Sequence, residues 1–233
     1  MIFLPGTDKQ VNFFLSSTEL NDKKVLIPGP GTVEIAQKII SGDPSKIVIV
    51  VDDYDSLITM RYRLQKSGEK NIDVRMMEYA NTDFRKETID VVYAQASLSV
   101  PSRNKITKEI KRILKPEGIY CAGEIVMLKD NPPDFVKDIW HSSDILPLHI
   151  DEAAEFYEEK GFDILEKKDL SFTLKDFYQD SERLLEKESK DLTEEEKSYH
   201  KKLLKKISHE SNVYLKLGGD DYMGFLALMM RKI

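Results

Sequence analysis

The sequence predicts an α/β protein whose core is a doubly wound, mostly parallel sheet of seven strands. Short apolar runs rich in β-branched residues alternate with longer amphipathic segments, as in consecutive βα units. The early runs are apolar at nearly every position, which is typical of strands covered by helices on both faces. Together these patterns indicate a Rossmann-like architecture.

The positions of the elements follow from the same patterns. Strands are expected at residues 24–28, 46–51, 72–77, 89–94, 119–126, 162–170 and 222–230. Helices are expected at residues 32–40, 54–65, 102–114 and 150–160, where apolar residues recur at helical spacing. Ser102 is expected to cap the third helix, and the Lys-Pro-Glu-Gly sequence at 115–118 to form the turn before the fifth strand.

A single domain, residues 1–233, is expected to contain all of these elements. The Pro-containing segment 127–148 is expected to be an irregular lid, and the highly charged segment 173–214 a helical insert that covers the pocket. One apolar face in this insert favours a helix that packs on the domain over a free coiled-coil arm. That face is formed by Leu192, Tyr199, Leu203, Leu204 and Ile207.

Composition narrows the classes of partner. A formal net charge of −6 without a basic stripe argues against nucleic acid, because phosphate binding needs clustered Lys and Arg. We expect no membrane partner and a cytoplasmic location, since no apolar run approaches the ~20 residues of a membrane-spanning helix and no signal peptide is evident. The single cysteine, Cys121, lies in an apolar run and is expected to be buried. Oligomeric state is left open, with a homodimer among the alternatives.

The main functional signal is the segment 25–32, VLIPGPGT, in which a strand runs into a turn that opens a helix. The turn is formed by Pro28, Gly29, Pro30 and Gly31. Glycines are needed where a nucleotide-like ligand approaches the backbone, because a Cβ would block contact. A simple tight turn between strand and helix would have the same pattern.

An acidic pair supports the nucleotide interpretation. Asp52 and Asp53 close the second strand, about 20 residues beyond the glycines, where a carboxylate can accept the hydroxyls of a ribose. The alternative is that Asp52, Asp53 or Asp55 caps the next helix.

Further motifs recur in the order found in class I S-adenosylmethionine-dependent methyltransferases, and from about Lys24 onwards the chain resembles that family. The motifs are Gly29 and Gly31, Asp52, the pair Glu78-Tyr79 after the third strand, the strand-four sequence Asp90-Val91-Val92-Tyr93-Ala94-Gln95, and the turn at 113–118. The resemblance implies S-adenosylmethionine as cofactor, an antiparallel last strand, and methyl transfer to a small-molecule acceptor. It implies a cofactor site comprising Pro28, Gly29, Pro30, Gly31, Asp52, Asp53, Glu78, Tyr79, Tyr93, Ala94 and Gln95.

The chain departs from the family pattern at two positions. Ile27 stands where the family usually has an acid, and Val33 where it often has a third glycine. The missing acid removes a partner for the donor's amino group, and a charge-assisted hydrogen bond is typically worth about 1.5–3 kcal/mol. The rigid Pro-Gly-Pro-Gly turn is expected to offset part of that loss by fixing the backbone before binding.

A general base is optional for methyl transfer, because a sulfonium methyl is already activated and alignment supplies much of the catalysis. Candidates for a base are Tyr93, His141 and His149, together with Glu124 at the end of the fifth strand. Each has a purely structural alternative, since a lone histidine is more often at the surface or structural. No cluster of His and Cys has the spacing of a metal site, so none is expected.

Other functions share this sheet. A nicotinamide-dependent oxidoreductase would need a glycine where Glu34 stands. An aminopropyl transferase would need an acid-rich motif after the fourth strand. A non-catalytic S-adenosylmethionine-binding or regulatory protein stays open, and Ile27 is the feature that motivates it.

Overall fold

The computed structural model describes the backbone of residues 2–191 and 194–233, and the side chains of these residues outside 188–203. Its strands are β1 (Lys24–Pro28), β2 (Lys46–Val51), β3 (Ile72–Met76), β4 (Ile89–Gln95), β5 (Leu114–Met127), β6 (Leu148–His149), β7 (Phe162–Asp169) and β8 (Met223–Lys232). Its α-helices are α1 (Thr7–Ser17), α2 (Val33–Ile39), α3 (Tyr54–Ser67), α4 (Arg103–Ile113), α5 (Asp134–Ser142), α6 (Ala153–Glu158), α7 (Thr173–Asp191) and α8 (Glu194–Lys216).

The main path of the sheet has the order β3-β2-β1-β4-β5-β8-β7, and β6 pairs with β5 off this path. β8 runs antiparallel to both of its neighbours, while the pairs from β3 to β5 are parallel. The predicted fold class and the antiparallel last strand are therefore confirmed. The strand order reverses between β1 and β4, and open α/β sheets bind ligands beyond the carboxyl ends of the strands at such a reversal.

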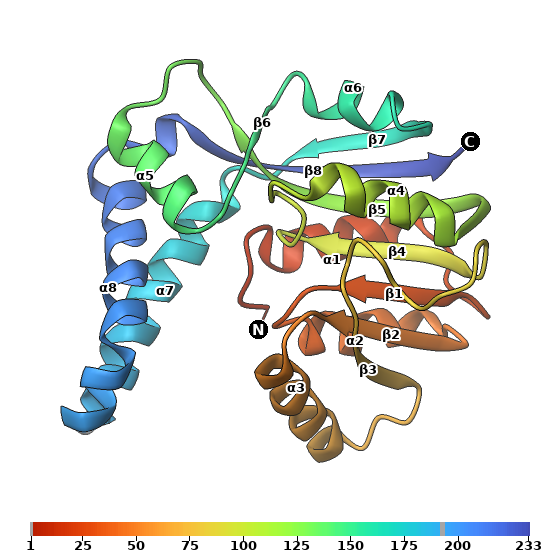
Figure 1. The fold of residues 1–233 in the computed structure, drawn as a ribbon, viewed down its shortest axis with the longest axis horizontal. Coiled ribbons are helices and arrows are strands. Elements are labelled where there is room, and N and C mark those ends of the chain that lie inside the picture. The colour runs from red at the N-terminus through yellow and green to blue at the C-terminus, as the bar shows by residue number, and fades with distance from the viewer. Residues whose placement is uncertain (1, 192–193) are drawn as a thin grey trace.

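Two apolar cores cover the two faces of the sheet. Alternate strand residues such as Leu26 and Val48 pack with α4 and α6, whereas Ile27 and Ile49 pack with α1, α2 and α3. Burial on both faces explains why the sequence of these strands is continuously apolar. The helices α7 and α8 lie side by side beyond the carboxyl ends of the parallel strands (Figure 1).

Several expectations about elements need correction. Helix α1 was not predicted, and the lid segment contains α5 and the short strand β6 rather than irregular chain. Ser102 occupies the N-cap position of α4 but makes no capping hydrogen bond through its side chain. The expected turn at 115–118 belongs to a longer β5, with Glu117 at φ 61° marking the irregularity.

The helical insert is confirmed as the pair α7 and α8. Of the apolar face expected there, the side chains of Leu192, Tyr199 and Leu203 lie outside the described part of the chain. Cys121 is fully buried, and burial raises the pKa of its thiol to about 12, which makes it an inert core residue.

Candidate cofactor-binding site

The glycine turn lies at the point where the strand order reverses. β1 pairs with β2 on one side and β4 on the other, and the Gly29 N–H donates to the Val50 carbonyl at 2.9 Å. Gly29 and Gly31 have φ values of 119° and 72°, which side chains with a Cβ rarely adopt. The turn thus needs glycine for its backbone conformation, independently of any ligand.

The loop after β4 packs directly onto this turn. A Cβ at Gly29 would lie 2.9 Å from the Ser97 Cβ, which is too close for any side chain. The Ser97 hydroxyl is buried there without a hydrogen-bond partner, and the neighbouring Ala96 has a strained φ of 53°. An unpaired hydroxyl is therefore buried directly beside the turn. No sequence pattern predicted a role for Ser97, although its place shortly after the strand-four motif could have indicated it.

Space is open above Gly31. A Cβ there would meet only the Leu4 Cδ2 atom, at 3.9 Å. Leu4 belongs to the segment that precedes α1. The Gln95 side chain holds this segment and the start of α1 by donating to the carbonyls of Pro5 at 2.8 Å and Thr7 at 3.0 Å. The start of the described chain therefore lies over the carboxyl end of β4. No sequence pattern predicted this covering.

The two predicted aspartates have different surroundings. The Asp53 carboxylate accepts the Ser56 N–H at 2.7 Å and caps α3, and hydrogen bonds with the Ser56 side chain and backbone lower the pKa of Asp53. Asp52 is exposed at the end of β2, beside the glycine turn. The capping alternative thus applies to Asp53, which leaves the carboxylate of Asp52 for a ligand.

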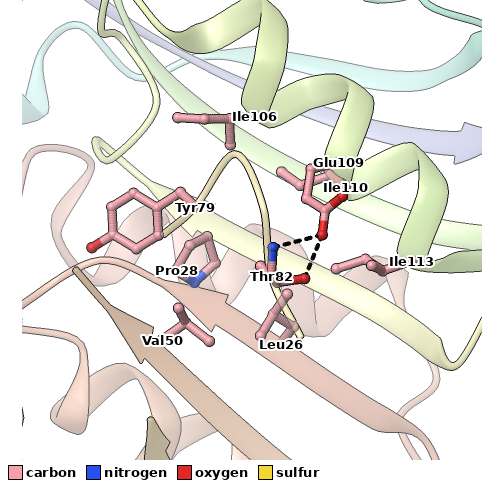
Figure 2. A pocket seen from close by; sticks show the side chains of 9 residues that line it. All are labelled: Leu26, Pro28, Val50, Tyr79, Thr82, Ile106, Glu109, Ile110 and Ile113. Carbon is pink, nitrogen blue, oxygen red and sulfur yellow. Dashed lines mark hydrogen bonds between the residues drawn. The ribbon is translucent and has the colours of Figure 1, made fainter. Parts of the chain in front are cut away.

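Tyr79 lies close to Asp52. Its ring is half-buried, and burial together with the Asp52 carboxylate raises the pKa of Tyr79 above its usual value. The ring lines a small apolar space of about 10 Å³ between β1 and α4, which Pro28 also lines (Figure 2). That space holds about one water, so a nucleoside base would have to bind on the outer side of Tyr79. Glu78 is exposed next to it.

The loop that carries Tyr79 is tied to α4. The buried Glu109 carboxylate accepts the Thr82 N–H at 2.8 Å and the Thr82 hydroxyl at 2.5 Å (Figure 2). Burial alone would raise the pKa of Glu109, but hydrogen bonds from Arg112 and Thr82 outweigh burial and lower it. Glu109 therefore positions the loop as an ionised side chain.

The remaining strand-four residues face the protein interior. Tyr93 is fully buried, packs against Phe14 with ring centroids 5.0 Å apart, and donates to the Gln95 side chain at 2.5 Å. Burial raises the pKa of Tyr93 well above its usual value, which argues against Tyr93 as a general base. The Ala94 carbonyl accepts a hydrogen bond from the Gln10 side-chain amide at 2.9 Å. Ile27 is also fully buried, so the position of the usual acid faces the core.

The lid histidines lie on separate elements. His141 is exposed in the last turn of α5, whereas His149 is half-buried on β6, where its ring nitrogen accepts the Asp151 N–H at 3.4 Å. The Glu124 carboxylate is fully buried and is held by Ser99, Tyr157 and, at 3.3 Å, Arg103. Because it is paired with Arg103 inside the protein, Glu124 serves the structure rather than proton transfer.

Among the described residues, no three or more His, Cys, Asp and Glu side chains are grouped closely enough to hold a metal ion. No helix in the described part of the chain is long and apolar enough to cross a bilayer.

A glycine turn and an acid at the reversal point of a parallel sheet, with an antiparallel β8 inserted beside β5, define a nucleoside-binding domain of the class I methyltransferase type. Residues 26–122 match the family described as "Methyltransferase domain". This part of the chain is therefore similar to a methyltransferase domain.

Comparison with known proteins agrees with this assignment. The chain is 27% identical over 128 residues to the sterol 24-C-methyltransferase of Saccharomyces cerevisiae, a match that covers 52% of this chain and 33% of that protein. The match to the sterol 24-C-methyltransferase of Pneumocystis carinii is similar, at 27% identity and 34% of the relative. The chain thus spans about a third of the length of these curated relatives.

Solved structures share the fold over nearly the whole chain. Phosphoethanolamine N-methyltransferase 2 of Haemonchus contortus, in complex with phosphomonomethylethanolamine and S-adenosylhomocysteine, has a TM-score of 0.81 at 15% identity, covering 98% of this chain and 54% of that one. The [4+2]-cyclase SpnF has a TM-score of 0.80 at 20% identity, covering 97% and 80%. At these identities the likeness establishes the fold alone.

Proposed function

We propose that this protein is an S-adenosylmethionine-dependent methyltransferase that acts on a small molecule. The observation that carries the proposal is the convergence of the open glycine turn, the exposed Asp52 and the unpaired Ser97 hydroxyl at the reversal point of a methyltransferase domain. The methyltransferases among the relatives support the same chemistry, each with its own acceptor.

The residues present match most of the chemical groups of S-adenosylmethionine, which is the methyl donor. Gly31 would allow the donor to approach the backbone, and Asp52 would accept hydrogen bonds from the ribose hydroxyls. The Tyr79 ring would contact the adenine base. Ser97 would contribute a hydroxyl. No carboxylate occupies the Ile27 position, so the amino group of the donor would have to find another partner. When bound, the donor supplies a methyl group whose bond to sulfur breaks, with the electron pair left on sulfur, as the acceptor's lone pair forms the new bond.

The chain's own contribution is alignment and exclusion of water. We propose that the segment before α1, held by Gln95, and the insert formed by α7 and α8 cover the site, with 127–148 as a lid. Because Tyr93 and Glu124 are sealed in the core, proton removal from the acceptor would fall to His141, His149 or solvent.

The domain organisation, cellular location and partners of the protein are also proposals. We propose one domain over residues 1–233 that works in the cytoplasm, supported by the buried thiol of Cys121 and by a sheet that runs through most of the chain. The proposed partner is a small molecule rather than nucleic acid, and a homodimer remains a prediction.

A second candidate function is donor binding without methyl transfer. The buried Ile27 favours it, because the usual acid is missing. The fold itself is compatible with activities other than methyl transfer, since the [4+2]-cyclase SpnF shares it. Incubating the protein with methyl-labelled donor and a metabolite panel separates the two candidates. Labelled product supports methyl transfer, whereas donor binding without any product supports the second candidate.

The glycine turn can be tested with a matched pair of variants. Gly31 and Gly68 have φ values of 72° and 75°, and a Cβ added at Gly68, which lies at the end of α3, would meet no atom within 4 Å. Gly31→Val and Gly68→Val should each cost roughly 1–2 kcal/mol of stability. Only Gly31→Val should weaken S-adenosylhomocysteine binding, by about tenfold or more. Equal affinities in calorimetry would show that the turn is not the site.

A further inference from the structure

An apolar cavity lies between the insert and the segment that precedes α1. Its volume is about 170 Å³. Its lining consists of Phe3, Ser181, Leu184, Leu185, Leu204 and Ile207. The lining thus comes from three segments, the start of the described chain, α7 and α8, which lie far apart in the sequence.

The chemistry of this cavity is uniform. Five of its lining side chains are hydrocarbon, and the Ser181 hydroxyl is already used, because it donates to the Phe177 carbonyl at 2.8 Å. No charged side chain lines it among those that the structure describes. A second hollow on α7 and α8 is different, since Glu182, Lys205 and His209 line it. The two helices therefore separate a charged surface from an apolar cavity.

The segment before α1 connects the cavity with the glycine turn. Phe3 lines the cavity, while the next residue, Leu4, reaches the space above Gly31. Two adjacent residues of one segment thus contact the cavity and the glycine turn. The Phe3 ring also contacts Phe177 on α7, with centroids 5.4 Å apart, which holds this wall against the insert.

The cavity is open to ligands. Phe3 is 40% exposed and Leu184 is 44% exposed, so two large apolar side chains of the lining remain in contact with solvent. In size, an enclosed cavity of about 150 Å³ lined by Leu, Ile and Phe is large enough for benzene. A volume of about 170 Å³ therefore accommodates an uncharged ring or short hydrocarbon chain.

We propose that this cavity binds the hydrocarbon portion of the methyl acceptor, so that the substrate class is an uncharged or largely apolar small molecule. The inference rests on the proposed function, because it takes the glycine turn as the donor site. An acceptor held there would extend past Leu4 towards the space above Gly31. A charged group on the buried portion would be rejected, since no side chain of the lining could compensate it.

The test compares two ligands of the same ring size on the unsubstituted protein. Toluene and benzoate differ in that benzoate carries a carboxylate. Toluene should shift the NMR signals of the Leu204 and Ile207 methyl groups in a saturable way, whereas benzoate at equal concentration should shift them at least tenfold less. Equal shifts from both ligands, or no shift from toluene, would overturn the proposal.

Variants link the cavity to the reaction. Leu184→Trp fills the cavity, whereas Arg183→Trp places the same ring on the neighbouring position, which is 75% exposed and does not line the cavity. Leu184→Trp should raise the Kd for toluene and the KM of an apolar acceptor about tenfold, while Arg183→Trp should change neither. S-adenosylhomocysteine affinity should be unchanged in both. Absence of donor binding in the unsubstituted protein would refute the proposed function, whereas normal donor binding with no response to Leu184→Trp would refute only this inference.

Discussion

The adjacent residues Asp52 and Asp53 have the same chemistry but opposite roles in the structure. The carboxylate of Asp53 is occupied by the Ser56 N–H at the start of α3, whereas Asp52 is exposed beside the glycine turn and close to Tyr79. The sequence placed both at the end of β2 but could not distinguish them, because the difference depends on which carboxylate meets the first turn of the helix.

Substitution of each aspartate should separate these roles. Asp52→Ala should weaken S-adenosylhomocysteine binding by about tenfold with little change in Tm, because it removes the proposed ribose acceptor. Asp53→Ala should lower Tm and leave donor affinity unchanged, because it removes the cap of α3. Calorimetry and thermal unfolding on both variants check this, and the reverse pattern would assign the ribose to Asp53.

At the scale of elements, the loops at the carboxyl ends of the strands are held by side chains from other elements. Glu109 on α4 fixes the loop of Tyr79 through Thr82, and Gln95 on β4 fixes the segment before α1. The strands themselves were predictable, because burial on both faces gives continuous apolar runs. The loop positions were not, since a single hydrogen bond between distant elements leaves no periodic pattern in the sequence.

The ionised Glu109 makes the anchoring of this loop pH-dependent. Its folded pKa is lowered, so its contribution to stability is complete above its unfolded pKa of about 4.3 and is lost as the pH falls through the folded pKa. Glu109→Gln should therefore be clearly less stable than the parent protein at pH 7, and the difference should shrink below about pH 4. Urea unfolding at several pH values measures it. The exposed Glu155 on α6 supplies the control, since Glu155→Gln makes the same change at the surface and should leave stability at pH 7 nearly unchanged.

At the scale of the whole molecule, α1 joins the start of the described chain to the middle and the end of the sheet. Gln10 is fully buried and donates to the Ala94 carbonyl of β4, and a Cβ at Gly123 of β5 would collide with the Gln10 side chain. It would also lie 2.6 Å from the Phe225 ring of β8. Close packing of α1, β5 and β8 therefore requires glycine at this position.

Gly123→Ala should consequently destabilise the protein by about 1–3 kcal/mol or more, as overpacking of a core does. Part of this loss comes from the contact with Gln10, so the double variant with Gln10→Ala should be less destabilised than the sum of the two single variants. Denaturant unfolding of the parent, the two single variants and the double variant gives the coupling free energy between Gln10 and Gly123. Simple additivity would show that Gln10 and Gly123 do not meet.

The sequence by itself determined the order of the seven main strands and of helices α2, α3, α4 and α6, the place of the glycine turn after β1, and the acid after β2. These features depend on local turns and on the apolar pattern of buried strands. Only the tertiary structure decided that α1 forms, that Leu4 lies over Gly31, and that Phe3 closes an apolar cavity against α7 and α8. These features arise from contacts between residues distant in the chain, such as Gln95 with Pro5, and such contacts exist only once the sheet has brought the segments together.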